Sequence, residues 1–138
     1  MRYRVALLGL LLPLAFATGC GESAQAKAEK TVCEGKKEIG TSVDSLQSMT
    51  ITDASTSTVQ NDIKGIEAGL QKVKEAEGQL SGSRKEAAEK ANAQMSAELS
   101  SISQELTNLS LPSALTKVLT VGEKLAASYK QAFTPVEC

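Results

Sequence analysis

Residues 111–136 read LPSALTKVLTVGEKLAASYKQAFTPV, and this stretch carries the clearest structural pattern in the chain. Its apolar residues recur at alternating intervals of four and three, which is typical of an amphipathic helix lying nearly parallel to its neighbours. Pro112 is tolerated in a first helical turn, and Pro135 disfavours helical backbone at Thr134. The sequence therefore predicts a helix that begins around residues 110–112 and ends at residues 134–135.

Three earlier stretches show the same spacing, and strand-like alternation is missing throughout. Capping boxes at residues 57–60 and 83–86 indicate where the second and third helices begin, and Gly78 and Gly82 break the chain between them. The apolar stripes are Val32, Ile39, Val43 and Leu46; Val59, Ile63, Ile66, Leu70, Val73 and Leu80; and Ala88, Ala91, Met95, Leu99, Ile102, Leu106 and Leu109.

Short linkers between four helices favour antiparallel neighbours, so we expect an all-α, up-down-up-down four-helix bundle. In this topology the first helix starts at the end of the bundle where the fourth helix finishes, and Cys33 and Cys138 fall at these two places. A three-helix bundle with a loosely packed first segment is the alternative, because the first stripe is thin. Two long helices in an extended hairpin are the third choice.

Residues 1–19 have the pattern of a signal peptide rather than of a folded domain. Arg2 and Arg4 precede an apolar stretch at residues 5–16, which is shorter than the roughly 20 residues of a bilayer-spanning helix. We therefore expect an exported chain with a polar tether at residues 20–30 and the helical bundle at residues 31–138.

The apolar stretch closes with Ala17-Thr18-Gly19-Cys20. This resembles the lipobox of bacterial lipoproteins, although that class prefers leucine where Ala17 stands. The resemblance covers only about the first 20 residues. It implies that the thiol of Cys20 receives a diacylglyceryl group and that the signal is cut before it. Fatty acyl chains, palmitate among them, would then hold the protein on the outer face of a bacterial membrane. Ordinary secretory cleavage after Ala17 is the alternative.

The cysteine count supports a disulfide bond. The chain has three cysteines, an odd number for an exported protein, and acylation of Cys20 leaves Cys33 and Cys138 free to pair. On the chain-entropy model, a loop of roughly 100 residues contributes about 4–5 kcal/mol. A redox pair and an intermolecular bridge are the alternatives, but the C-x-x-C spacing of redox pairs is absent.

Composition argues against catalysis, metal binding and nucleic-acid binding. The chain has no histidine and a formal net charge of -1, so it lacks the usual general base, the commonest metal ligand and a basic surface. Glu77 follows Val73 in the second stripe, but Ala76 can take the inward position, so we expect Glu77 to be exposed. We expect no catalytic residues, no metal and no cofactor.

Glycines interrupt two of the predicted helices. Gly65 and Gly69 lie one turn apart, and Gly122 interrupts the fourth stripe, which indicates either close helix approach or space for a ligand. If the bundle held a ligand, Leu70, Gly122 and Tyr129 would lie near its lining.

The sequence therefore predicts a non-catalytic interaction or accessory protein of the cell envelope, with a protein partner bound to an exposed helix face. The alternative is a carrier of an apolar small molecule or lipid between the helices.

Overall fold

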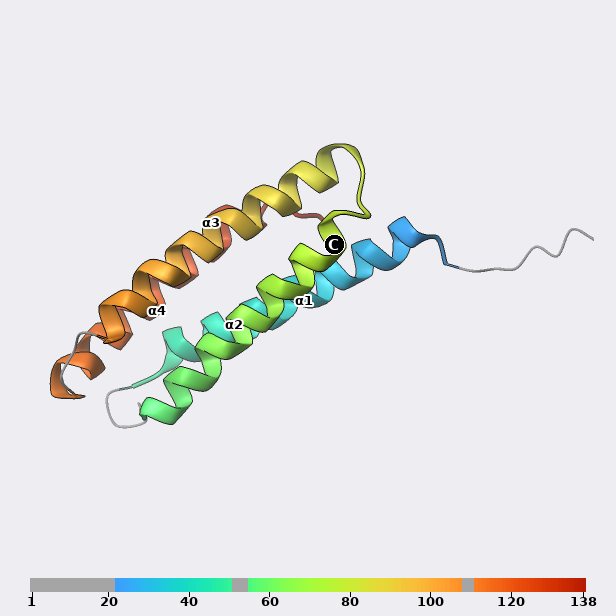
Figure 1. Ribbon diagram of the computed structural model, residues 1–138. Coiled ribbons are helices and arrows are strands. Elements are labelled where there is room, and N and C mark those ends of the chain that lie inside the picture. Colours follow the sequence, from blue (N-terminus) through green and yellow to red (C-terminus); the bar gives the residue numbers. More distant parts are fainter. Residues whose placement is uncertain (1–21, 51–54, 108–110) are drawn as a thin grey trace, which may run out of the picture.

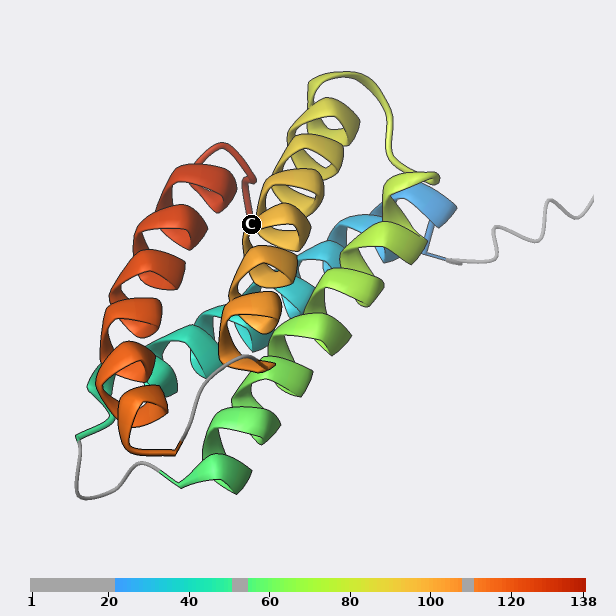
Figure 2. The same cartoon turned by 60° about the vertical axis from the view of Figure 1, so that its left-hand side comes forward.

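The computed structural model describes residues 22–50, 55–107 and 111–138, and these form four antiparallel helices (Figure 1). The helices are α1 (Ala24–Ser48), α2 (Thr56–Glu77), α3 (Gly82–Thr107) and α4 (Leu111–Phe133). Each helix packs against the next along the chain, and α4 closes the ring against α1 (Figure 2). The predicted four-helix bundle is confirmed, and the three-helix alternative is wrong because α1 packs against both α2 and α4.

The predicted apolar stripes form the core. Val43, Val73, Ile102 and Leu125 contribute from the four helices in turn, and all are fully buried. The largest fully buried side chains are Phe133, Ile39, Leu46, Ile66, Met95, Ile102 and Leu125. The predicted core positions at 106, 109, 111 and 115 lie outside the described side chains.

The first helix begins earlier than the sequence pattern predicts. α1 starts at Ala24 with Ser23 as its N-cap, so residues 24–30 of the predicted polar tether are helical. Tertiary contacts explain the extension: Ala28 is buried one turn before Val32, and Gln25 accepts a hydrogen bond from Ser81 in the turn between α2 and α3. Because the extra turns are packed against the bundle, the helical domain begins almost immediately after residue 23.

The caps of α2 and α3 also differ from the predicted capping boxes. Ser55 rather than Ser57 caps α2, and its side chain accepts a hydrogen bond from the Thr58 amide. α3 begins at Gly82, whose φ of 57° lies in the left-handed region that favours glycine. The turn between α2 and α3 therefore depends on a glycine at this position.

Glycines let α1 approach two neighbours at backbone distance. A Cβ on Gly35 would lie 2.7 Å from the carbonyl oxygen of Gly69 in α2, and a Cβ on Gly122 of α4 would lie 2.7 Å from the carbonyl oxygen of Leu46. Of the two interpretations of these glycines, the contacts at Gly69 and Gly122 match close helix approach. α1 therefore packs closely against both α2 and α4.

Candidate functional site

The predicted acylation site, Cys20, lies outside the described residues. In sequence it precedes the first residue of α1, Ala24, by Gly21, Glu22 and Ser23 alone. The start of α1 lies at the same end of the bundle as the turn between α2 and α3 (Figure 1). Among the described residues, no helix combines the length and apolar character needed to span a membrane.

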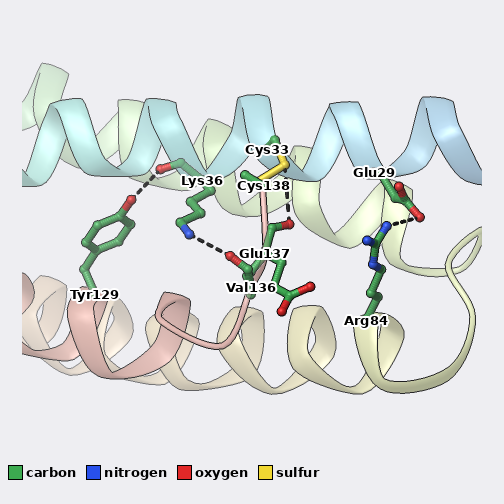
Figure 3. The surroundings of a disulfide bond; sticks show 8 residues. All are labelled: Glu29, Cys33, Lys36, Arg84, Tyr129, Val136, Glu137 and Cys138. Atoms are coloured by element: carbon green, nitrogen blue, oxygen red, sulfur yellow. Dashed lines mark hydrogen bonds and ion pairs between the residues drawn. A yellow bond between two sulfur atoms is a disulfide. The ribbon is translucent and has the colours of Figure 1, made fainter.

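A disulfide bond joins Cys33 of α1 to Cys138 in the segment that follows α4. The Cα atoms are 5.6 Å apart and the sequence separation is 105 residues, so the bond closes nearly the whole helical domain. Figure 3 shows the C-terminal segment leaving α4 and crossing to α1 to reach Cys33. The predicted pairing of Cys33 with Cys138 is thus present in the structure.

Further contacts hold the C-terminal segment against α1. Val136 is buried, and its carbonyl oxygen accepts a hydrogen bond of 2.7 Å from Nζ of Lys36. Beside it, Arg84 of α3 forms an ion pair with Glu29 of α1 (Figure 3). Hydrogen bonding to Arg84 is the main reason that the pKa of Glu29 lies below its ordinary value. One end of the bundle is therefore tied together by a covalent bond, a lysine and an ion pair.

Tyr129 of α4 forms another contact with α1, close to the C-terminal segment. Its hydroxyl donates a hydrogen bond of 3.0 Å to the carbonyl oxygen of Lys36 (Figure 3), and Gly40 leaves room for it, since a Cβ there would lie 2.8 Å from the hydroxyl oxygen. The ring also packs against Phe133, with 5.3 Å between ring centroids. Burial, followed by the charge of Asp44, raises the pKa of Tyr129. These contacts give the side chain a packing role between two helices.

The three residues that we considered as ligand-facing do not gather in one place. Gly122 and Tyr129 both lie on α4 against α1, where their contacts are with Leu46 and Lys36. Leu70 lies on α2 and lines a groove toward α3.

The sequence pattern does not predict that groove. It lies between α2 and α3, has a volume of about 550 Å³ and is open to solvent. Its lining residues are Leu70, Gln71, Lys74 and Glu75 from α2, and Asn92 and Ser96 from α3. Asn92 is only 8% exposed, and its buried Oδ1 accepts no hydrogen bond from the part of the chain that the structure describes. In the sequence, the groove is indicated only by an asparagine at position 92, four residues after the core position Ala88.

Glu77, at the last position of α2, is more buried than we expected. Ala76 does take the inward position, but the Glu77 side chain is half-buried and its Oε2 has no hydrogen-bond partner within the described ranges. Desolvation, followed by repulsion from Glu89, raises the pKa of Glu77. The described residues contain no group of histidine, cysteine, aspartate and glutamate side chains that could hold a metal ion.

Comparisons of the chain with protein-family models, with curated proteins and with solved structures find no match.

Proposed function

We propose that this chain is an exported lipoprotein, anchored through Cys20 to the outer face of a bacterial membrane, and that it acts there as a non-catalytic interaction or accessory protein of the cell envelope. The pairing of Cys33 with Cys138 carries this proposal. A structural disulfide suits an oxidising compartment outside the cytoplasm, and it leaves Cys20 as the single cysteine available for acylation.

The early start of α1 supports a short anchor. With only Gly21, Glu22 and Ser23 between Cys20 and the first helical turn, an acylated Cys20 would hold the bundle close to the lipid surface. The end that carries the α1 N-terminus and the turn at residues 78–81 would then face the membrane. The grooved face between α2 and α3 runs away from this end and would be accessible from outside.

An interaction role is favoured over a carrier role by the way the core is filled. A carrier would need residues such as Gly122 and Tyr129 to line a cavity. Instead, Gly122 lies against the backbone of Leu46, and the Tyr129 hydroxyl bonds to the backbone of Lys36. The surface that remains for a partner is the exterior of the helices.

The intact mass of the protein purified from the membrane fraction tests the anchor. We expect a chain that starts at Cys20, carries the added mass of acyl chains and gains two hydrogens on reduction. Cys20→Ser is the matched control, because it should abolish acylation and leave the Cys33–Cys138 bond in place. A soluble, unacylated chain that starts at Thr18 would refute the anchor. A lipid that co-purifies non-covalently in native mass spectrometry would favour the carrier instead.

A further inference from the structure

The C-terminal segment, residues 134–138, covers a small apolar hollow between α1 and α3 beyond the end of α4 (Figure 3). Val136 is only 5% exposed, and it lines the hollow together with Val32 of α1, Leu80 of the turn between α2 and α3, and Ala87 of α3. The hollow has a volume of about 20 Å³, which is room for about one water molecule. Its apolar wall is thus completed by a segment that lies outside the four helices.

Non-covalent contacts hold this segment only weakly. Val136 is its one buried side chain, because the other four residues of the segment are exposed. Lys36 of α1 donates a hydrogen bond to the carbonyl oxygen of Val136, whereas the amides of Thr134 and Val136 bond back to α4. Ordering five residues costs conformational entropy at each of them, and a buried valine with one lysine hydrogen bond offsets only part of that cost. The disulfide bond to Cys33 therefore decides whether the segment stays against α1.

The disulfide bond itself lies at the surface. Cys138 is exposed, whereas Cys33 is partly covered by its neighbours on α1. Thiol–disulfide exchange begins with the attack of a thiolate on one sulfur atom, and exposed disulfides are more often labile or regulatory than buried ones. A reductant can therefore reach Sγ of Cys138 without any unfolding of the helices.

The bundle has other contacts that keep α4 against α1. Phe133, the last residue of α4, is fully buried, and the hydroxyl of Tyr129 donates its hydrogen bond to the backbone of Lys36. Gly122 adds a close backbone contact with Leu46 further along the same pair of helices. All of these contacts precede residue 134, so they persist when the C-terminal segment is free, and the opening is confined to residues 134–138.

We propose that reduction of the Cys33–Cys138 bond is a switch that releases the C-terminal segment and uncovers the apolar surface formed by Val32, Leu80 and Ala87. The reductant is a dithiol, such as a protein with a Cys-x-x-Cys site. Its first thiolate attacks Sγ of Cys138 and forms a mixed disulfide, and Cys33 leaves as a thiolate. Its second thiolate then displaces Cys138. The dithiol is oxidised to a disulfide by two electrons, and the two protons that it loses end on Cys33 and Cys138.

The switch goes beyond the proposed function. The uncovered surface would lie near the end of the bundle where α1 begins, which is the end that an acylated Cys20 would hold close to the lipid. Release depends only on contacts of the described residues. It therefore occurs equally in an acylated and in an unacylated chain.

Reduction of the folded protein by dithiothreitol tests access to the bond. The full chain is purified in the oxidised form from whichever cell fraction contains it, and alkylation followed by intact-mass measurement counts the reduced molecules. We expect the folded chain to be reduced at a rate within about a hundredfold of the rate in concentrated urea, because Sγ of Cys138 is attacked without unfolding. A slower rate would overturn the proposal, since the bond would then open only through unfolding.

Nuclear magnetic resonance of isotope-labelled methyl groups locates the structural change. On reduction, the signals of Val32, Leu80 and Val136 should shift, because the C-terminal segment no longer covers the hollow. The signals of Leu46 and Ile102, which lie toward the other end of the bundle, should stay in place. Circular dichroism should show the same helix content before and after reduction.

Variants separate release of the segment from other effects of the reductant. Replacing both Cys33 and Cys138 by serine should give the spectrum of the reduced wild type, and dithiothreitol should not change it. Val136→Ser in the oxidised protein should move the Val32 and Leu80 signals toward their reduced positions. The matched control is Gln131→Ser, because Gln131 is an exposed residue of α4 outside the hollow, and it should leave both signals unchanged.

Two further results would overturn the switch: loss of helix content on reduction, or Val32 and Leu80 signals that do not respond to it. The anchor is judged separately by the mass of the purified chain. An acylated chain whose segment stays in place on reduction refutes the switch alone, whereas an unacylated chain that releases it refutes the anchor alone.

Discussion

Replacing Gly69 with alanine tests whether α1 and α2 truly meet at backbone distance. The new Cβ would lie 2.6 Å from Cγ1 of Ile39, 2.8 Å from the carbonyl oxygen of Gly35 and 3.2 Å from the amide nitrogen of Ile39. Two of these atoms are backbone, and the Ile39 side chain is fully buried. Non-bonded heavy atoms prefer separations of about 3.5 Å or more, so α1 and α2 must separate by about 0.7 Å at the crossing.

Two opposing effects determine how much Gly69→Ala changes the free energy of unfolding. Alanine is favoured over glycine in a helix interior by about 1 kcal/mol. Overpacking a well-filled core costs about 1–3 kcal/mol, and the upper part of that range applies because α1 is also held by α4 and by the disulfide. We therefore expect Gly69→Ala to lower the free energy of unfolding by about 1–2 kcal/mol.

Gly78→Ala is the matched control with the opposite sign. Gly78 caps α2 with φ of -64° and ψ of -19°, which alanine adopts readily, and a Cβ there would meet nothing within 4 Å. The variant should gain about 0.4–1 kcal/mol, because alanine restricts the unfolded chain. Urea unfolding of the oxidised proteins, followed by circular dichroism, measures both. A Gly69→Ala variant as stable as the wild type would refute the close crossing.

Three further predictions follow from the described contacts. Reducing the Cys33–Cys138 bond, or replacing both cysteines by alanine, should lower the free energy of unfolding by about 4–5 kcal/mol in urea titrations; a loss below about 1 kcal/mol would contradict the entropic account. Tyr129→Phe should lower it by about 1 kcal/mol in the same titration, since the hydrogen bond to Lys36 is lost; no change would mean that the bond adds nothing. Burial raises the pKa of Glu77 above its unfolded value, so its carboxyl favours the folded state most at low pH and this contribution is lost as pH rises through the folded pKa. Glu77→Gln should thus be the more stable protein at pH 7, with a gap that narrows as pH falls through the folded pKa and closes below the ordinary value of 4.5 when unfolding is measured across pH; a gap independent of pH would refute the assignment.

The sequence pattern predicts the bundle well because the core positions follow from the helical spacing of the apolar residues. Positions such as Val43, Val73 and Met95 recur at helical spacing, and each is fully buried. The topology follows from short linkers, and the positions of Cys33 and Cys138 support it independently.

Element boundaries were harder to predict because tertiary contacts decide them. The run Ser55-Thr56-Ser57-Thr58 offers several residues able to cap a helix, and sequence alone does not select Ser55. Likewise, residues 24–30 are rich in good helix formers, but their helix is stabilised by burial of Ala28 and by contacts with the turn between α2 and α3. Such contacts exist only once the bundle has formed.

The groove was missed for a related reason. Asn92 follows Ala88 by one turn and Ala91 by one residue, so the pattern leaves open whether it lies at the edge of the core or in solvent. That outcome depends on how far α3 is rotated toward α2, which the spacing of apolar residues defines only to within part of a turn. Burial of the amide therefore becomes visible only in the structure.

The packing of the bundle is unequal from one pair of neighbouring helices to the next. α1 meets α2 at Gly69 and α4 at Gly122 through backbone contacts, and the disulfide ties it to the end of α4. Movement at these contacts would push backbone against backbone. The boundary between α2 and α3 instead contains an open groove, and the buried Oδ1 of Asn92 beside it has no hydrogen-bond partner within the described residues. The close backbone contacts among the described residues therefore involve α1, which does not line the groove.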